Sequence, residues 1–142
     1  MRALLDVNVL IALFDPDHVH HARAWRWFEN EGRRGWATCP LTQNGCVRVM
    51  VQPGYANPVP VATMVERLRA ATAAPEHAFW PDDASLLDVR RFDAERIHGP
   101  RQVTDLYLLG LAVAHGGRFA TFDEGVPVSA VRGAQAKHLV RI

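Results

Sequence analysis

The chain has 142 residues, a length typical of one domain with its own hydrophobic core. Its 16 basic and 15 acidic side chains leave a formal net charge of +1, which argues against strong, sequence-independent binding to long nucleic acid. No run of eighteen apolar residues is present, and Asp6 interrupts the first apolar stretch, so we expect neither a membrane span nor a secretory signal. We predict a single domain over residues 1–142, located in the cytoplasm.

The spacing of apolar residues predicts strands that alternate with helices. The expected strands cover residues 2–5, 36–39, 77–80, 118–122 and 138–142. The expected helices cover residues 7–14, 16–30, 41–51, 84–92 and 105–115, with another that starts at residue 61, an exposed loop over 96–102, and Thr104 as the N-cap of the last helix. This alternation is typical of an α/β fold with a mostly parallel sheet and helices on both faces.

Two cysteines, Cys39 and Cys46, lie seven residues apart in an apolar neighbourhood. Their spacing lacks the close pairs that hold zinc in structural sites. We therefore expect both to be buried free thiols.

Three aspartates stand where a parallel sheet collects its functional side chains. Asp6 follows the first predicted strand and Asp123 follows the strand predicted at 118–122. Ligands bind beyond the carboxyl ends of such strands, and Asp105, in the first turn of a buried helix, can reach the same crevice. Taken singly, Asp6 and Asp105 are alternatively helix caps and Asp123 a turn residue. Together, three crowded carboxylates ionise readily only if a cation neutralises them, and Mg²⁺ prefers oxygen ligands.

Three segments together resemble the PIN domain. They are Leu-Leu-Asp-Val-Asn-Val-Leu at 4–10, Thr-Asp-Leu-Tyr-Leu-Leu-Gly-Leu-Ala at 104–112 and Ala-Thr-Phe-Asp at 120–123. Within that family the chain is most similar to VapC toxins, and Cys-Pro-Leu-Thr-Gln-Asn-Gly at 39–45 resembles a mycobacterial branch. The resemblance runs along essentially the whole chain and implies a three-layer α/β sandwich.

The resemblance also implies a function. The implied protein is a Mg²⁺-dependent endoribonuclease, the toxin of a type II toxin–antitoxin system. It cleaves RNA to leave a 5′-phosphate, and Mn²⁺ is expected to substitute for Mg²⁺. By resemblance, Asp6, Asp105 and Asp123 are its metal-binding and catalytic residues. The implied partners are RNA, a VapB-like antitoxin and a second copy of the chain.

One departure from the PIN pattern concerns a fourth acid, expected on the helix after the second strand. Residues 32–65 contain no Asp or Glu, and Gln43 or Asn44 occupies that region. A neutral amide offers an oxygen but no charge, so we expect one firmly held ion. We predict that Asn8, Asn44 and Arg101 bind substrate, with Asn8 also a candidate to hydrogen-bond Asp6. The alternative for each is a helix cap or a solvated surface residue.

Two other functions stay open. A receiver-type phosphoacceptor domain also places aspartates at strand ends, but it has an acid pair after the first strand and a lysine near the last. Here Asp6 stands alone and Lys137 is the only lysine. A PIN-like module that binds RNA or protein without cutting is favoured by the missing fourth acid. A nucleotide hydrolase of the P-loop type is disfavoured because no Gly-rich loop ends in Gly-Lys-Ser/Thr.

Two further clusters carry weaker hypotheses. One is a second metal site, since histidines three apart share a helix face. Its residues are Asp15, Asp17, His18, His20 and His21. The other cluster is aromatic, and either packs in the core or forms a groove for an antitoxin segment. Its residues are Trp25, Trp27 and Phe28.

Overall fold

A computed structural model describes all 142 residues and contains one five-stranded sheet. Its strands are β1 (Ala3–Leu5), β2 (Trp36–Thr38), β3 (His77–Phe79), β4 (Arg118–Thr121) and β5 (Leu139–Arg141). Its α-helices are α1 (Val7–Phe14), α2 (His21–Asn30), α3 (Pro40–Met50), α4 (Val61–Thr72) and α5 (Val103–Ala114). All neighbouring strands are parallel, in the order β3-β2-β1-β4-β5, which confirms the predicted α/β architecture. None of the helices is both long and apolar enough to cross a membrane.

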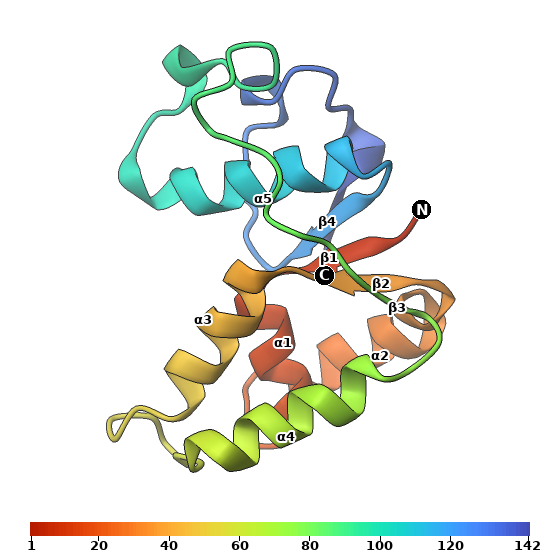
Figure 1. Cartoon of the computed structure of the whole chain (residues 1–142), viewed down its shortest axis with the longest axis vertical. Helices are drawn as coiled ribbons and strands as arrows, with labels where there is room; N and C mark the ends of the chain where they lie inside the picture. Colours follow the sequence, from red (N-terminus) through yellow and green to blue (C-terminus); the bar gives the residue numbers. More distant parts are fainter.

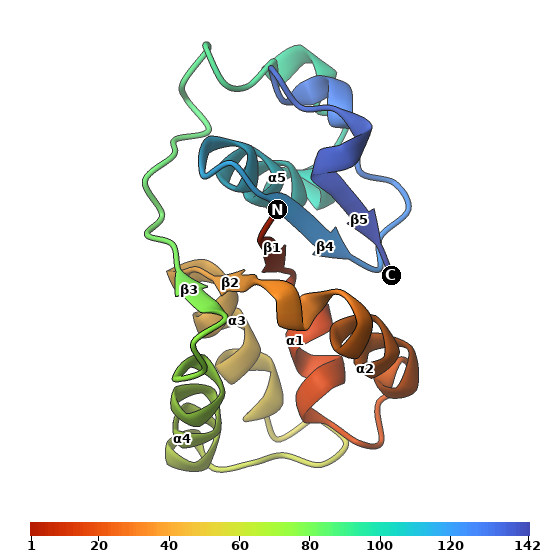
Figure 2. The ribbon, with the colours of Figure 1, turned by 90° about the vertical axis from the view of Figure 1, so that its right-hand side faces the viewer.

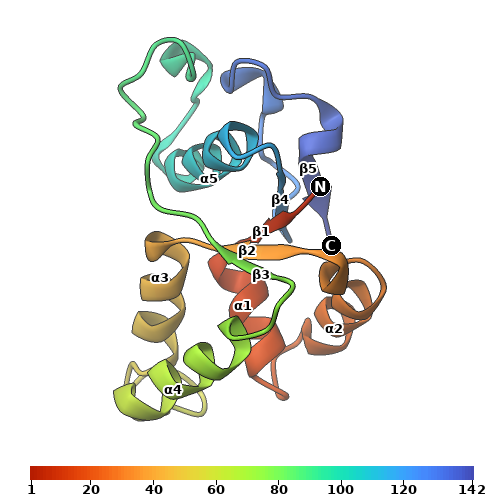
Figure 3. The ribbon, with the colours of Figure 1, turned by 45° about the vertical axis from the view of Figure 1, so that its right-hand side comes forward.

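The sheet is the middle of three layers (Figure 1). Helices α1 to α4 cover one face and α5 covers the other, an arrangement also clear in Figure 3. Because side chains alternate along a strand, each strand supplies both layers. Leu4 and Phe119 pack in the core that includes α5, whereas Trp36 and Ala120 pack in the core that includes α1, α3 and α4. Burial on both faces explains why the inner strands β1, β2 and β4 are predominantly apolar.

The chain order creates a switch point at the centre of the sheet. From β1 the chain moves outward to β2 and β3, then returns to add β4 and β5 on the other side of β1 (Figure 2). In open parallel sheets ligands bind at such a point, beyond the carboxyl ends of the two diverging strands. Helix α5 ends just before β4 begins, so it runs back along the sheet and brings its first turn to this same edge.

Several predicted boundaries are corrected. Helix α2 starts at His21 rather than residue 16, because residues 15–20 form turns in which the Asp15 carboxylate accepts the Asp17 N–H. The loop predicted at 96–102 ends in a 3₁₀ turn, Pro100–Gln102, that leads directly into α5. Thr104 is consequently inside the helix and Gln102 is the N-cap residue. Both cysteines are buried free thiols, as predicted.

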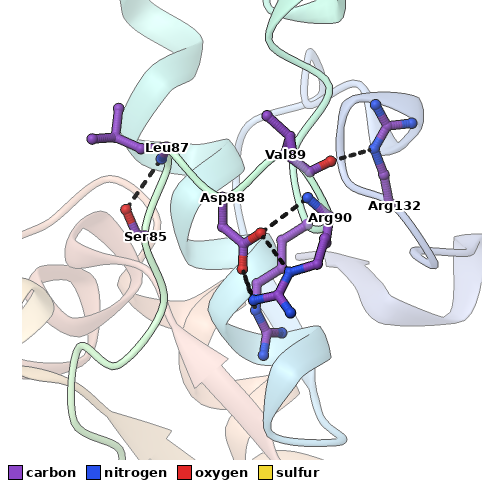
Figure 4. A network of polar contacts seen from close by, with 7 residues as sticks. Ser85, Leu87, Asp88, Val89, Arg90 and Arg132 are labelled. Atoms are coloured by element: carbon purple, nitrogen blue, oxygen red, sulfur yellow. Dashed lines mark hydrogen bonds and ion pairs between the residues drawn. The ribbon is translucent and has the colours of Figure 1, made fainter.

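The helix predicted at 84–92 is absent, and the segment is a series of turns (Figure 4). The Ser85 hydroxyl accepts the Leu87 N–H, and the Asp88 carboxylate accepts the Arg90 N–H. Such short polar side chains compete with helical hydrogen bonding because they satisfy nearby backbone donors locally. The apolar spacing was misleading here, since Leu87 is 88% and Val89 76% exposed, while Arg132 holds the Val89 carbonyl.

The end of that segment is anchored by Phe92, which is buried against α5 at Gly110. A methyl group at position 110 would overlap carbons of the Phe92 ring. We predict that Gly110→Ala lowers the free energy of unfolding by about 1 to 3 kcal/mol through overpacking, measured by urea denaturation. Gly99→Ala is the control, because a methyl group there meets no atom within 4 Å. Equal stability of the two variants would contradict this packing.

Candidate active site

The three predicted aspartates come from three separate elements and lie together at the switch point. Asp6 directly follows β1 and is the N-cap of α1. Asp123 stands two residues beyond β4, and Asp105 is the third residue of α5. Asp6 is buried, Asp105 half-buried and Asp123 exposed, so the cluster opens from the sheet edge toward solvent.

Thr121 ties this cluster together. Its hydroxyl donates to Asp6 Oδ2 at 2.7 Å and accepts the Asp123 N–H at 3.1 Å. The other Asp6 oxygen accepts the Val7 N–H at 2.7 Å, and Asp123 Oδ1 accepts the Gly125 N–H at 2.7 Å. The last residue of β4 therefore fixes the Asp6 carboxylate and the backbone of Asp123 at the same time.

Electrostatic coupling shows that the three carboxyl groups share one environment. Burial raises the pKa of Asp105 to about 7, with repulsion from Asp6 and a hydrogen bond with the Asp123 carboxyl group adding to the increase. Burial also raises the pKa of Asp6, although the hydrogen bonds from Thr121 and Val7 act against it; Asp123 repels Asp6 as well. The folded chain thus disfavours the simultaneous ionisation of Asp6 and Asp105 beside Asp123.

The cluster has the composition of a site for a hard cation. None of the ion pairs in the chain includes Asp6, Asp105 or Asp123, so no arginine or lysine balances their charge. No group of three or more His, Cys, Asp or Glu side chains is arranged to hold one metal ion by itself. Carboxylate oxygens of this kind are the ligands that hard divalent cations such as Mg²⁺ prefer, and Mg²⁺ keeps waters or phosphate oxygens in its remaining positions.

Comparison with known proteins agrees with this geometry. The PIN domain model matches residues 3–131. The chain is 53% identical to ribonuclease VapC44 of Mycobacterium tuberculosis over the full length of both chains. It is 44% identical to ribonuclease VapC39 of the same species, over 94% of this chain and 96% of that one, and 47% identical to VapC38 over 87% and 86%. The chain belongs to the PIN domain family. The predicted resemblance to VapC proteins is confirmed by these relatives.

The remaining predicted site residues of this PIN domain lie around the cluster. Asn8 is exposed in the first turn of α1 and makes no hydrogen bond to Asp6; Thr121 and Val7 occupy that role. Arg101 is exposed in the 3₁₀ turn just before α5, one turn ahead of Asp105. Their contacts with substrate stay predictions.

The region expected to carry the fourth acid does not join the three aspartates. Gln43 donates to the Thr38 hydroxyl at 2.9 Å, and Asn44 lines a groove between α3 and α4. Helix α3 approaches α1 through Gly45, where a Cβ atom would stand 2.7 Å from Val7 Cγ2. Glycine at this position allows α3 to pack closely beside the start of α1. A substrate contact by Asn44 therefore stays a prediction, without support from its position.

The residue that the sequence reasoning missed is Thr121. Its signal was present in the Ala-Thr-Phe-Asp segment, because a hydroxyl two residues before an aspartate can accept the N–H of that aspartate. The sequence alone does not show that β1 pairs with β4. In that pairing Leu5 lies opposite Ala120, which brings Asp6 beside Thr121.

The second metal hypothesis fails on the geometry of its residues. Asp15 is buried and accepts a short hydrogen bond from the Tyr55 hydroxyl, which lowers the pKa of Asp15. The His21 ring bonds the Ala12 carbonyl oxygen at 2.7 Å. Both side chains are thus engaged in hydrogen bonds: Asp15 ties the 15–20 turns to the loop that contains Tyr55, and His21 ties α2 to α1.

The aromatic cluster divides between core and surface. Trp25 and Phe28 line an apolar cavity of about 230 Å³, together with residues of α1 and Trp36. Trp27 does not line the cavity and packs against the core, with a buried indole N–H that has no partner. Trp27 and Phe28 thus both pack against the core, as one of the two alternatives predicted, while the cavity beside Trp25 and Phe28 leaves the antitoxin groove a prediction.

The raised pKa of Asp105 predicts an unusual effect on stability. A carboxyl group whose folded pKa exceeds its unfolded value stabilises the fold at low pH, and this contribution is lost as the pH rises through the folded pKa. Metal-free protein should therefore lose stability between about pH 4 and pH 7. At pH 8, Asp105→Asn should be more stable than the parent by about 1 to 2 kcal/mol, after allowance for solvent screening.

Thermal or urea unfolding with a chelator present measures this effect. Glu95→Gln, an exposed acid in the Ala94–Arg96 turn, is the control and should follow the parent curve. If Asp105→Asn were less stable than the parent at pH 8, the repulsion assigned to the cluster would be wrong.

Proposed function

We propose that this PIN domain is a Mg²⁺-dependent endoribonuclease that acts as the toxin of a toxin–antitoxin pair in the cytoplasm. The observation that carries the proposal is the uncompensated cluster of Asp6, Asp105 and Asp123 at the switch point of the sheet. The relatives named as ribonucleases support RNA as the substrate. Asp6 and Asp105 are the proposed direct metal ligands, and Asp123 acts through water.

The proposed mechanism assigns each carboxylate a separate task. Asp6 and Asp105 would hold the Mg²⁺ ion, which would polarise a phosphodiester oxygen and lower the pKa of a bound water. Asp6 is held by hydrogen bonds to both oxygens, so the direction of its remaining lone pairs is fixed. Asp123 is exposed, with one oxygen held by the Gly125 N–H, and its other oxygen is available to orient the attacking water for in-line displacement. Cleavage would leave a 5′-phosphate.

The proposed antitoxin segment docks in the apolar cavity formed by α1, α2 and Trp36. Eight of the nine residues that line it are hydrophobic, and Glu76 is the single acid at its boundary. Desolvated apolar pockets of this kind are where interfaces gain most of their binding energy. A VapB-like antitoxin with aromatic or aliphatic anchors and a basic residue near them fits this surface. We also propose a homodimer, by family resemblance.

Metal-dependent cleavage tests the proposed reaction. The parent protein should cut a structured RNA with Mg²⁺ or Mn²⁺ and lose activity with a chelator. Asp6→Asn and Asp105→Asn should each reduce the cleavage rate by about 100-fold or more, because a fixed charge at the reacting phosphate is lost. Glu124→Gln, an exposed acid beside Asp123, is the control.

Two outcomes would reject the proposal. Cleavage that persists in both aspartate variants would remove the assigned site. RNA binding without any cleavage by the parent protein would favour the non-cutting PIN-like module.

Binding of the antitoxin tests the apolar cavity. We predict that Trp25→Ala weakens antitoxin binding by about 10- to 100-fold, as expected for truncation of an aromatic anchor. Val89→Ala, at an exposed position remote in sequence from the cavity, should bind normally. Calorimetry with the cognate antitoxin gives both affinities, and thermal unfolding checks that Trp25→Ala is folded. Normal binding by folded Trp25→Ala would place the antitoxin elsewhere.

A further inference from the structure

Phe122 stands directly before Asp123 and carries two side chains from the start of α2 on its ring. The Arg23 guanidinium carbon lies 4.9 Å from the centroid of the Phe122 ring, within the range of a cation–π contact. The His20 ring lies 4.8 Å from the same centroid, tilted by 41°. The arrangement therefore fixes a basic side chain beside the residue that carries the outermost carboxylate of the site.

Arg23 has no partner for its charge within the chain. It is exposed and takes part in none of the ion pairs. A guanidinium stacked on an aromatic ring keeps its N–H groups at its edge, where they can donate two parallel hydrogen bonds to a phosphate. Stacking also limits its rotamers, so less entropy is lost when a ligand binds.

RNA can bind beside the acidic cluster only if cations balance the repulsion between the carboxylates and the RNA phosphates. Three carboxylates repel the phosphates that flank a scissile bond, and one divalent ion at the centre acts on the reacting phosphate rather than on its neighbours. Arg101 lies beside α5, on one face of the sheet. Helix α2 covers the opposite face near the ends of β4 and β5 (Figure 2), and its Arg23 stacks on Phe122, the residue that follows β4.

We infer that Arg23, positioned by Phe122 and His20, binds a backbone phosphate of single-stranded RNA on the α2 side of the crevice. The inference rests on the proposed ribonuclease function, because it identifies where the substrate strand leaves the acidic cluster. Arg23 is the phosphate-binding residue, and Phe122 is a positioning residue that acts through it. An unpaired strand suits the site, since proteins read such RNA at splayed backbones with arginine and aromatic side chains.

Binding of a short fluorescent single-stranded RNA tests the inference. The measurement uses the Asp105→Asn protein so that the RNA stays intact, and fluorescence anisotropy gives Kd at several salt concentrations. Adding Arg23→Ala should raise Kd about five- to tenfold and reduce the slope of log Kd against log salt by about 0.7, the value for one phosphate contact on a single strand. Arg67→Ala is the matched control, an exposed arginine without an ion pair on α4, at the other end of the helical layer (Figure 2).

Kinetics in the otherwise unchanged protein separate binding from chemistry. Arg23→Ala should raise KM about five- to tenfold and change kcat less than about twofold, since the residue binds flanking RNA in the ground and transition states alike. Phe122→Leu should give a smaller rise in KM. The double variant should be no worse than Arg23→Ala, because Phe122 acts through the guanidinium.

The outcomes distinguish the two proposals. Unchanged Kd, salt slope and KM in Arg23→Ala, with a parent that cleaves RNA, would overturn the inference and leave the ribonuclease function standing. Loss of antitoxin binding with unchanged RNA binding would also overturn it and assign Arg23 to the protein partner. A parent that does not cleave RNA would reject the proposed function, while the anisotropy arms would still report whether Arg23 contacts RNA.

Discussion

The chemistry at the carboxyl edge of the sheet depends on mutual repulsion among the carboxylates of Asp6, Asp105 and Asp123. Burial and crowding favour the protonated forms of Asp6 and Asp105, and the pKa of Asp105 is raised to about 7. Thr121 opposes their separation, since its hydroxyl donates a hydrogen bond to Asp6 and accepts one from the backbone N–H of Asp123. The site therefore favours positive charge. Binding of a divalent ion would relieve the repulsion among the carboxylates and would not add an uncompensated buried charge.

The fold supplies that arrangement through its order of strands. Because β1 lies at the centre with β2 and β4 on either side, the chain diverges at the carboxyl edge where Asp6 emerges. Both faces of the sheet are covered, so the helices are available to present charged groups from two directions: α5 brings Asp105 and the preceding Arg101, and α2 brings Arg23 over Phe122. The acidic centre and its proposed basic borders therefore come from different layers of one sandwich.

The sequence was sufficient for features that depend on local pattern. Buried strands, most helices and the three aspartates follow from apolar spacing and from the resemblance carried by three segments. It was insufficient where tertiary pairing or local side-chain hydrogen bonds decide. Ser85 and Asp88 turn an apolar segment away from a helix, the Pro100–Gln102 turn moves the start of α5 ahead of Thr104, and Thr121 replaces Asn8 as the partner of Asp6. The stacking of Arg23 on Phe122 joins residues 99 positions apart, and no spacing rule relates them.

Direct calorimetric titration with Mn²⁺ tests most simply whether a cation relieves the crowding of the three acids. The parent protein should bind one ion saturably at neutral pH. Asp6→Asn and Asp105→Asn should abolish this binding, and Asp123→Asn should weaken it less, because that carboxylate is proposed to act through water. Undiminished ion binding in both Asp6→Asn and Asp105→Asn would show that the crowded carboxylates are not the metal site.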